Sequence, residues 1–142
     1  MYKELKSGRN EKMISLDIII PVYNEEEVLD NLFQRLKKVF SPENLQFNKI
    51  KSVQYLIIDD GSKDKSSEII QRYIKAGIPA KLYRFTRNFG HQNAVSAGLD
   101  KSTSDVVAVI DADLQDPPEV ILEMLKKWRE GFDVVYGVRR KR

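Results

Sequence analysis

Cysteine is absent from the 142-residue sequence, and histidine occurs only once. Without cysteine the chain can form neither disulfide bonds nor thiolate zinc sites, which suits a reducing compartment such as the cytoplasm. Long apolar runs are missing too, because none approaches the roughly 20 residues of a membrane-spanning helix. Residues 1–12 are charged and contain no apolar signal core. We therefore expect a soluble chain.

An excess of one charge is also missing. The 24 basic and 21 acidic residues leave a formal net charge of +3, which gives no reason to expect a nucleic-acid groove. Hydrophobic residues make up 42% of the sequence and charged residues 32%, as in ordinary globular proteins. A chain of this length suits one domain that buries roughly two-thirds of its unfolded surface.

Apolar, β-branched runs alternate along the sequence with amphipathic helical patterns. Buried strands are predicted at residues 16–22, 53–58, 81–86, 106–110 and 132–136. This alternation predicts one α/β domain, residues 15–142, with a mainly parallel sheet and helices on both faces. Residues 1–14 are expected to form a polar, frayed lead-in, and residues 41–52 a polar connection. Asn24 is the expected N-cap of the first helix.

Polar motifs directly follow four of the predicted strands. They are Tyr23-Asn24-Glu25, Asp59-Asp60, Arg87-Asn88 and the pair Asp111 and Asp113. Right-handed crossovers place the carboxyl ends of parallel strands at one edge of the sheet, where the ligands of such sheets bind. The sequence therefore predicts that these motifs share one binding site.

The motif after the fourth predicted strand carries two acids one residue apart. In extended chain, Asp111 and Asp113 send their side chains the same way, and two such carboxylates repel each other unless a cation lies between them. Gln115 follows on the same alternation and can add a neutral oxygen ligand. A lone Asp-x-Asp is as often a pair of loop acids. The agreement among the four motifs favours a cation site.

Four motifs resemble, in their order along the chain, those of the family 2 glycosyltransferases with the GT-A fold. They are Pro21-Val22-Tyr23-Asn24-Glu25, Asp59-Asp60-Gly61-Ser62 with Asp64, Arg87-Asn88-Phe89-Gly90 and Asp111-Ala112-Asp113-Leu114-Gln115-Asp116-Pro117-Pro118. Within that family the sequence is most similar to the polyprenyl-phosphate sugar transferases, the group of the dolichol-phosphate mannosyltransferases and bactoprenol glucosyltransferases. The resemblance covers residues 16–139 and is specific at the level of the superfamily.

The resemblance implies roles for individual residues. The pocket for the nucleotide base and ribose would be formed by Pro21, Tyr23, Glu25, Asp59 and Asp60. The metal-binding motif would be Asp111 and Asp113, with Gln115 as a further metal ligand or diphosphate contact and Asp113 as the candidate catalytic residue. Arg87, Asn88 and Asp111 would lie near the diphosphate or the sugar. Simpler roles, compatible with binding, are a rim aromatic for Tyr23 and a complement to the helix dipole for Glu25.

The same resemblance implies an inverting transfer from a UDP- or GDP-sugar, assisted by Mg²⁺ or Mn²⁺ because the ligands are oxygens. The implied acceptor is a polyprenyl phosphate at the cytoplasmic face of a membrane, and a lipid monophosphate arrives ionised without a general base. Catalytic domains of this family continue beyond the metal motif into an acceptor-binding segment. We therefore expect residues 15–142 to be the donor-binding half of the domain, truncated at its C-terminus. The basic residues 139–142 are expected to be a solvated stub, with a contact to lipid phosphates or anionic headgroups as the alternative.

Two other functions fit parts of the pattern. A flavodoxin-like phosphoacceptor signalling domain would also place acids at strand ends, but it would not explain Tyr23-Asn24-Glu25 or the Asp-x-Asp spacing. A donor-binding module without catalysis would follow from truncation alone. Outside the motifs, His91 is expected to be a polar loop residue and Trp128 a core residue. The sheet edge after the fifth predicted strand is free to pair with another copy of the chain, which would make a homo-oligomer.

Overall fold

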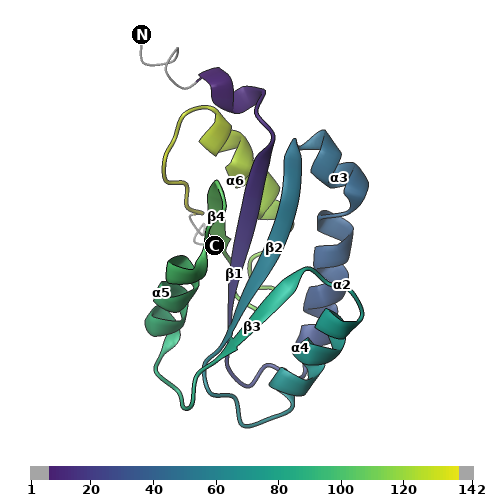
Figure 1. Cartoon of the computed structure of the whole chain (residues 1–142), viewed down its shortest axis with the longest axis vertical. Coiled ribbons are helices and arrows are strands. Elements are labelled where there is room, and N and C mark those ends of the chain that lie inside the picture. Colours follow the sequence, from purple (N-terminus) through teal and green to yellow (C-terminus); the bar gives the residue numbers. More distant parts are fainter. Residues whose placement is uncertain (1–6, 138–142) are drawn as a thin grey trace, which may run out of the picture.

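The computed structural model describes residues 7–137, which form a parallel sheet flanked by helices (Figure 1). The strands are β1 (Ile14–Val22), β2 (Ile50–Asp59), β3 (Ala80–Arg84) and β4 (Val106–Val109), in the spatial order β3-β2-β1-β4. The helices are η1 (Ser7–Asn10, a 3-10 helix), α2 (Leu29–Val39), α3 (Pro42–Phe47), α4 (Ser66–Lys75), α5 (His91–Lys101) and α6 (Glu119–Arg129). Every neighbouring pair of strands is parallel, so all four carboxyl ends lie at one edge.

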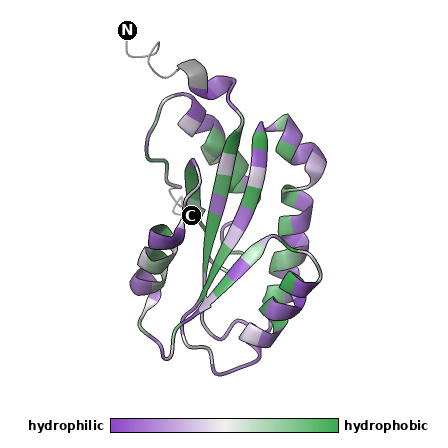
Figure 2. Cartoon of the chain, in the orientation of Figure 1, coloured by the Kyte–Doolittle hydropathy of each residue, from purple (hydrophilic) through white to green (hydrophobic). Residues whose placement is uncertain are grey.

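The two faces of the sheet are covered by different helices. Ile18 and Ile20 of β1 enter the larger core, which α2, α4 and α6 cover, whereas Ile19 enters a smaller core with Ala94 of α5. This follows from the two-residue period of a strand. Gly98 lets α5 lie close to the sheet, because a Cβ there would be 2.5 Å from Cγ2 of Ile19. The helices carry apolar and polar patches, as amphipathic helices do (Figure 2). The predicted α/β class is confirmed.

A buried carboxylate fixes the connection between α5 and β4. Asp17 of β1 is 2% exposed and accepts hydrogen bonds from the hydroxyls of Ser102 and Ser104, both at 2.7 Å. It also accepts the backbone N–H of Thr103 at 3.2 Å. Charged acceptors make the stronger hydrogen bonds of proteins. The start of β4, and with it the acidic motif that follows, is therefore tied to the central strand.

Proline is tolerated in the central strand because of where β4 ends. The N–H of Ile110 donates to the carbonyl of Ile19 at 3.1 Å, so the backbone N–H and C=O groups of Ile19 point toward β4. The backbone nitrogen of Pro21, two residues further on, points to the same side, but Ile19 is the last residue of β1 that pairs with β4. Its missing N–H therefore leaves no ladder hydrogen bond unmade, as expected for a proline at a strand end.

The predicted fifth strand is wrong. Residues 132–136 form no strand and bend at Asp133, and no strand within residues 7–137 pairs with the outer edge of β4. A strand is defined by its hydrogen-bonded neighbour, which an apolar β-branched pattern alone does not supply. The other four predicted strands are confirmed, with ends that shift by a few residues.

Two local expectations in the first half of the chain are also wrong. Helix α2 begins at Leu29 and not after Asn24, because Asn24 has a left-handed φ of +52° and its side chain accepts the backbone N–H of Lys63 at 2.8 Å. The connection over residues 41–52 contains helix α3, whose N-cap Ser41 accepts a backbone N–H, and the beginning of β2.

The described part of the lead-in is docked on α6. The guanidinium of Arg9 lies 4.5 Å from the ring centroid of Trp128 and donates a hydrogen bond to the backbone carbonyl oxygen of Trp128 at 3.0 Å. The buried guanidinium of Arg129 donates to four backbone carbonyls, those of Arg9, Lys12, Asn48 and Lys49. Residues 9–12 are therefore held in place, contrary to the expectation of fraying, and Trp128 packs against the larger core as predicted.

Residues 1–6 and the basic residues 139–142 lie outside the described part of the chain. Within that part, no helix has both the length and the apolar character needed to cross a membrane.

Candidate functional site

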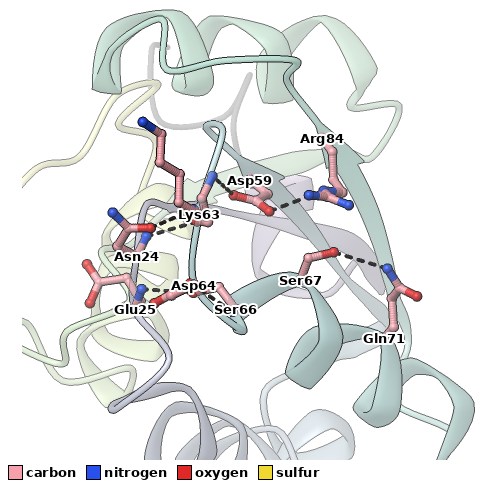
Figure 3. Close-up of polar contacts among 10 residues, drawn as sticks. Asn24, Glu25, Asp59, Lys63, Asp64, Ser66, Ser67, Gln71 and Arg84 are labelled. Atoms are coloured by element: carbon pink, nitrogen blue, oxygen red, sulfur yellow. Dashed lines mark hydrogen bonds and ion pairs between the residues drawn. The ribbon is translucent and has the colours of Figure 1, made fainter.

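The loops after β1 and β2 are joined by hydrogen bonds at the carboxyl edge of the sheet (Figure 3). The backbone N–H of Asn24 donates to Oγ of Ser62, and that of Glu25 to Oγ of Ser66, both at 2.9 Å. In return, the backbone N–H of Lys63 donates to Oδ1 of Asn24 at 2.8 Å. Because donors come from both loops, each loop fixes the other. This places Glu25 beside the first turn of α4.

Asp60 holds the loop that precedes α5. Its carboxylate is 4% exposed and accepts the backbone N–H groups of Phe89 at 2.7 Å and Gly90 at 3.0 Å. The side-chain amide of Asn88 donates to it as well, at 3.2 Å. All three donors belong to the Arg-Asn-Phe-Gly motif. The second aspartate of the β2 motif therefore determines where that motif lies.

Glycine is required where these two loops touch. Gly61 has a φ of +79°, and a Cβ there would lie 2.4 Å from the carbonyl carbon of Arg87, closer than any real contact. The guanidinium of Arg87 in turn lies 4.2 Å from the ring centroid of Phe89. The Arg-Asn-Phe-Gly loop therefore packs against the backbone of the β2 loop.

Asp59 lies beneath the edge and does not face solvent. Its side chain is 0% exposed, and its Oδ1 accepts the backbone N–H of Ser62 at 2.9 Å. Its Oδ2 accepts no hydrogen bond within residues 7–137 and lies 3.5 Å from Nε of Arg84 on β3 (Figure 3). This carboxylate supports the turn that carries Ser62 and, through it, the β1 loop.

Four acids from three loops share one electrostatic neighbourhood. Burial raises the pKa of Glu25 above its ordinary value, and repulsion from Asp113, Asp64 and Asp111 raises it further. Nε2 of His91 lies 3.1 Å from Oδ1 of Asp111, which ties the start of α5 to the acidic motif. A carboxyl whose pKa rises because of neighbouring acids marks an unneutralised negative charge. Such a place suits a divalent cation.

The acidic motif is not the extended chain that the sequence predicts. β4 ends at Val109, residues 112–113 form a turn, and Leu114 has a left-handed φ of +61°. The backbone N–H of Gln115 donates to Oδ1 of Asp113 at 3.1 Å. The expected alternation from Asp113 to Gln115 is therefore wrong. Among the residues that the structure describes, no three His, Cys, Asp or Glu side chains are arranged as a metal site.

The structure brings most of the predicted site residues to one region and leaves two beneath it. Glu25 interacts electrostatically with Asp111 and Asp113, and Asn88 donates to Asp60 in the loop that leads to His91, which contacts Asp111. Tyr23 directly follows β1 at the same edge and is 43% exposed. Pro21 is buried within β1, and Asp59 is buried under the turn.

His91 is the residue that sequence reasoning missed. It was expected to be an uninvolved loop residue, but it is the first residue of α5 and contacts Asp111. Its place directly after the Arg-Asn-Phe-Gly motif was the available signal, because that motif is expected at the ligand-binding edge. The bonds from the β1 loop to Ser62 and Ser66 were not predicted either.

The sequence matches a known family over most of its length. The family model "Glycosyl transferase family 2" matches residues 17–142. The chain is 47% identical over 129 residues to an uncharacterized glycosyltransferase, YkcC, of Bacillus subtilis (strain 168), covering 91% of this chain and 38% of that protein. It is 38% identical over 128 residues to an undecaprenyl-phosphate 4-deoxy-4-formamido-L-arabinose transferase of Pseudomonas syringae pv. syringae (strain B728a), covering 89% and 36%. The chain thus spans less than two-fifths of the length of these relatives.

A solved structure shares the fold. The mannosyltransferase PcManGT from Pyrobaculum calidifontis, in complex with GDP-Man and Mn²⁺, has a TM-score of 0.66 and 17% identity, over 88% of this chain and 38% of that one. The predicted GT-A type of α/β fold is therefore confirmed, and so is the resemblance to the polyprenyl-phosphate sugar transferases. The phosphoacceptor signalling class, which the sequence alone left open, has no support in these matches. From the family match and the shared arrangement of strands, we conclude that the chain belongs to glycosyltransferase family 2.

Proposed function

We propose that residues 15–142 are the donor-binding half of a metal-dependent, inverting glycosyltransferase that transfers a sugar from a nucleotide-sugar to a polyprenyl phosphate. The observation that carries this proposal is the electrostatic interaction of Glu25, in the loop after β1, with Asp111 and Asp113, in the loop after β4, together with the contact between His91 and Asp111. Membership of glycosyltransferase family 2 supports it.

The neighbouring loops offer the contacts that a nucleoside diphosphate needs. Tyr23, exposed at the edge, presents a ring face to the base. Glu25 accepts hydrogen bonds from the ribose hydroxyls, and Asp59 and Asp60 complete that pocket through the turn and loop that they hold. Arg87 and Asn88 lie on the loop that Asp60 fixes, where a guanidinium and an amide suit the diphosphate or the sugar.

The donor set fits a hard divalent cation. Asp111 and Asp113 would hold Mg²⁺ or Mn²⁺, with Gln115 as a further ligand or diphosphate contact, because carboxylate and amide oxygens are the ligands that these ions prefer. Burial and repulsion from Asp113, Asp64 and Asp111 together raise the pKa of Glu25, and a bound cation would relieve that repulsion. A bound ion supplies neutralisation of the charge that develops on the nucleoside diphosphate as the sugar leaves, and Asp113 is the proposed catalytic residue through that contact.

The acceptor is proposed from the relative that is named for undecaprenyl phosphate. A lipid monophosphate is ionised at neutral pH, so it attacks without a general base from this chain. Such an acceptor places the whole protein at the cytoplasmic face of a membrane.

Isothermal titration of the chain with UDP-sugars and GDP-sugars, with and without Mn²⁺, tests the proposal. We expect binding of at least one donor, dependent on the metal and lost in the variant that combines Asp111→Asn with Asp113→Asn. Asp100→Asn, which neutralises an exposed acid on α5, is the matched control and should bind as the wild type does. No metal-dependent binding to any donor would overturn the proposal. Donor hydrolysis by this chain and by the natural gene product then distinguishes a donor-binding module from a catalytic one.

A further inference from the structure

A cation at the end of strand β3 faces a buried carboxylate. Arg84 is the last residue of β3 and lies opposite Asp59 in the register of β2 with β3. Its Nε lies 3.5 Å from Oδ2 of Asp59, and no other cation among the residues that the structure describes forms an ion pair with that carboxylate (Figure 3). Because Oδ2 is buried and accepts no hydrogen bond within residues 7–137, the charge of Arg84 is what compensates it.

The two aspartates of the β2 motif differ in how their charges are stabilised. Asp60 accepts three hydrogen bonds from the Arg-Asn-Phe-Gly loop. Within residues 7–137, the side chain of Asp59 accepts one, from the backbone N–H of Ser62. Hydrogen bonds stabilise the charge of a buried carboxylate, and where they are few a nearby cation has to do so. Asp59 therefore depends on Arg84, whereas Asp60 is held by its donors.

The backbone fixes the point from which Arg84 reaches Asp59. The N–H of Phe85, the next residue, donates to the carbonyl oxygen of Asp59 at 2.8 Å. The side chain of Arg84 is 54% exposed. Its replacement therefore changes the charge beside Asp59 without opening a cavity in the core, and the variant should fold.

Three contacts connect Arg84 to the loop after β1, although β2 lies between β3 and β1 in the sheet. Oδ2 of Asp59 faces Arg84, and Oδ1 of the same carboxylate accepts the backbone N–H of Ser62 at 2.9 Å. Oγ of Ser62 accepts the backbone N–H of Asn24 at 2.9 Å, and Asn24 directly precedes Glu25. Because both oxygens belong to one planar group, a cation that holds Oδ2 also orients Oδ1 toward the turn.

We propose that Arg84 is a positioning residue for the donor site. It holds the carboxylate of Asp59, which holds the turn at Ser62, and that turn sets the β1 loop with Glu25. The effect on donor binding rests on the proposed function, because it assumes that the β1 loop contacts a nucleotide-sugar. The order of the β1 loop does not depend on that assumption and is measurable without a ligand.

Amide hydrogen exchange of the chain without ligand tests the structural step. The Asn24 amide donates to Ser62, so its exchange reports whether the two loops are joined. We expect Arg84→Gln to speed this exchange about 3- to 10-fold, and to speed that of the Ile57 amide in the middle of β2 less. Arg84→Lys keeps the charge, and Lys81→Gln removes an exposed cation of the same strand; both should stay within about 2-fold of the wild type.

Titration with a nucleotide-sugar and Mn²⁺ tests the effect on the site. The dissociation constant of Arg84→Gln should rise about 3- to 10-fold, and those of Arg84→Lys and Lys81→Gln should change by less than about 2-fold. A double-mutant cycle with Asp59→Asn separates an action through Asp59 from a direct contact with the donor. Asparagine keeps the Oδ1 acceptor for Ser62 and needs no counter-charge, so Arg84→Gln should change affinity by less than about 2-fold in that background.

Three results would overturn the proposal. The first is unchanged Asn24 exchange in Arg84→Gln, and the second is equal acceleration by Arg84→Lys. The third is an equal loss of affinity with and without Asp59→Asn, which would assign Arg84 a direct contact with the donor. The exchange comparison needs no substitution at Asp59, so it decides the question even if that variant does not fold. A wild type that binds no donor would instead refute the proposed function, and faster Asn24 exchange in Arg84→Gln would still support the positioning role.

Discussion

Replacing Gly61 by alanine tests the contact between the β2 loop and the Arg-Asn-Phe-Gly loop. Gly61 has a φ of +79°, a conformation that costs an L residue about 1–2 kcal/mol. The added Cβ would lie 2.4 Å from the carbonyl carbon of Arg87 and 2.6 Å from the backbone N of Asn88, so backbone must move. Overpacking of this kind costs about 1–3 kcal/mol. We expect Gly61→Ala to lower the free energy of unfolding by about 2–5 kcal/mol.

Gly77→Ala is the matched control, because its φ is +106° and nothing lies within 4 Å of the added Cβ. Urea denaturation of both variants should show the control losing only the backbone strain, so that Gly61→Ala exceeds it by about 1–3 kcal/mol. Since Asp60 orders residues 88–90 next to Gly61, titration with a nucleotide-sugar and Mn²⁺ should show weaker binding by Gly61→Ala alone. Equal losses of stability in the two variants would refute the close contact.

Three further substitutions test other contacts. Folding raises the pKa of Glu25, so the contribution of this carboxyl to stability is present below its unfolded pKa and is lost as pH rises through its folded pKa. In urea denaturation between pH 4 and 7, the free energy of unfolding of Glu25→Gln should therefore rise relative to that of the wild type as pH rises. A rise of the wild type relative to the variant would contradict this. Asp17→Ala should cost about 1–3 kcal/mol in the same assay, because three donors lose a buried, charged acceptor, while the exposed Asp100→Ala should cost little. Gly98→Ala should cost about 1–3 kcal/mol in the wild type and less in an Ile19→Ala background, because alanine removes the Cγ2 atom that the added Cβ would meet at 2.5 Å; equal costs in the two backgrounds would place the clash elsewhere.

The strands and their shared edge were predictable because both depend on short-range signals. Buried parallel strands are continuous β-branched runs, and residues 53–58 and 106–110 show this clearly. Crossover handedness then orders the strand ends without any knowledge of side-chain contacts. The family motifs lie at those ends, so the sequence could name the residues of the candidate site. Their roles in binding and catalysis stay predictions.

The errors concern features that depend on distant partners. Asn24 has the composition of an N-cap, but a donor 39 residues away takes its side chain and the helix starts later. The turn at residues 112–113 depends on how the chain leaves β4, which the spacing of two aspartates does not determine. Residues 132–136 have the sequence pattern of a strand but are not part of the sheet that residues 7–137 form. Helix α3 is different, because Ser41 followed by Pro42 is a local start signal that was available in the sequence.

The hydrogen bonds between the β1 and β2 loops have a consequence for affinity. Ordering loop residues lowers their conformational entropy, and a flexible site pays this cost when its ligand binds. Here the hydrogen bonds of the Ser62 and Ser66 hydroxyls and of the Asn24 side chain order the loops during folding, before any ligand is present. A ligand therefore binds to loops that are already ordered. Its dissociation constant should depend more on whether these hydrogen bonds are formed than on the length of the loops.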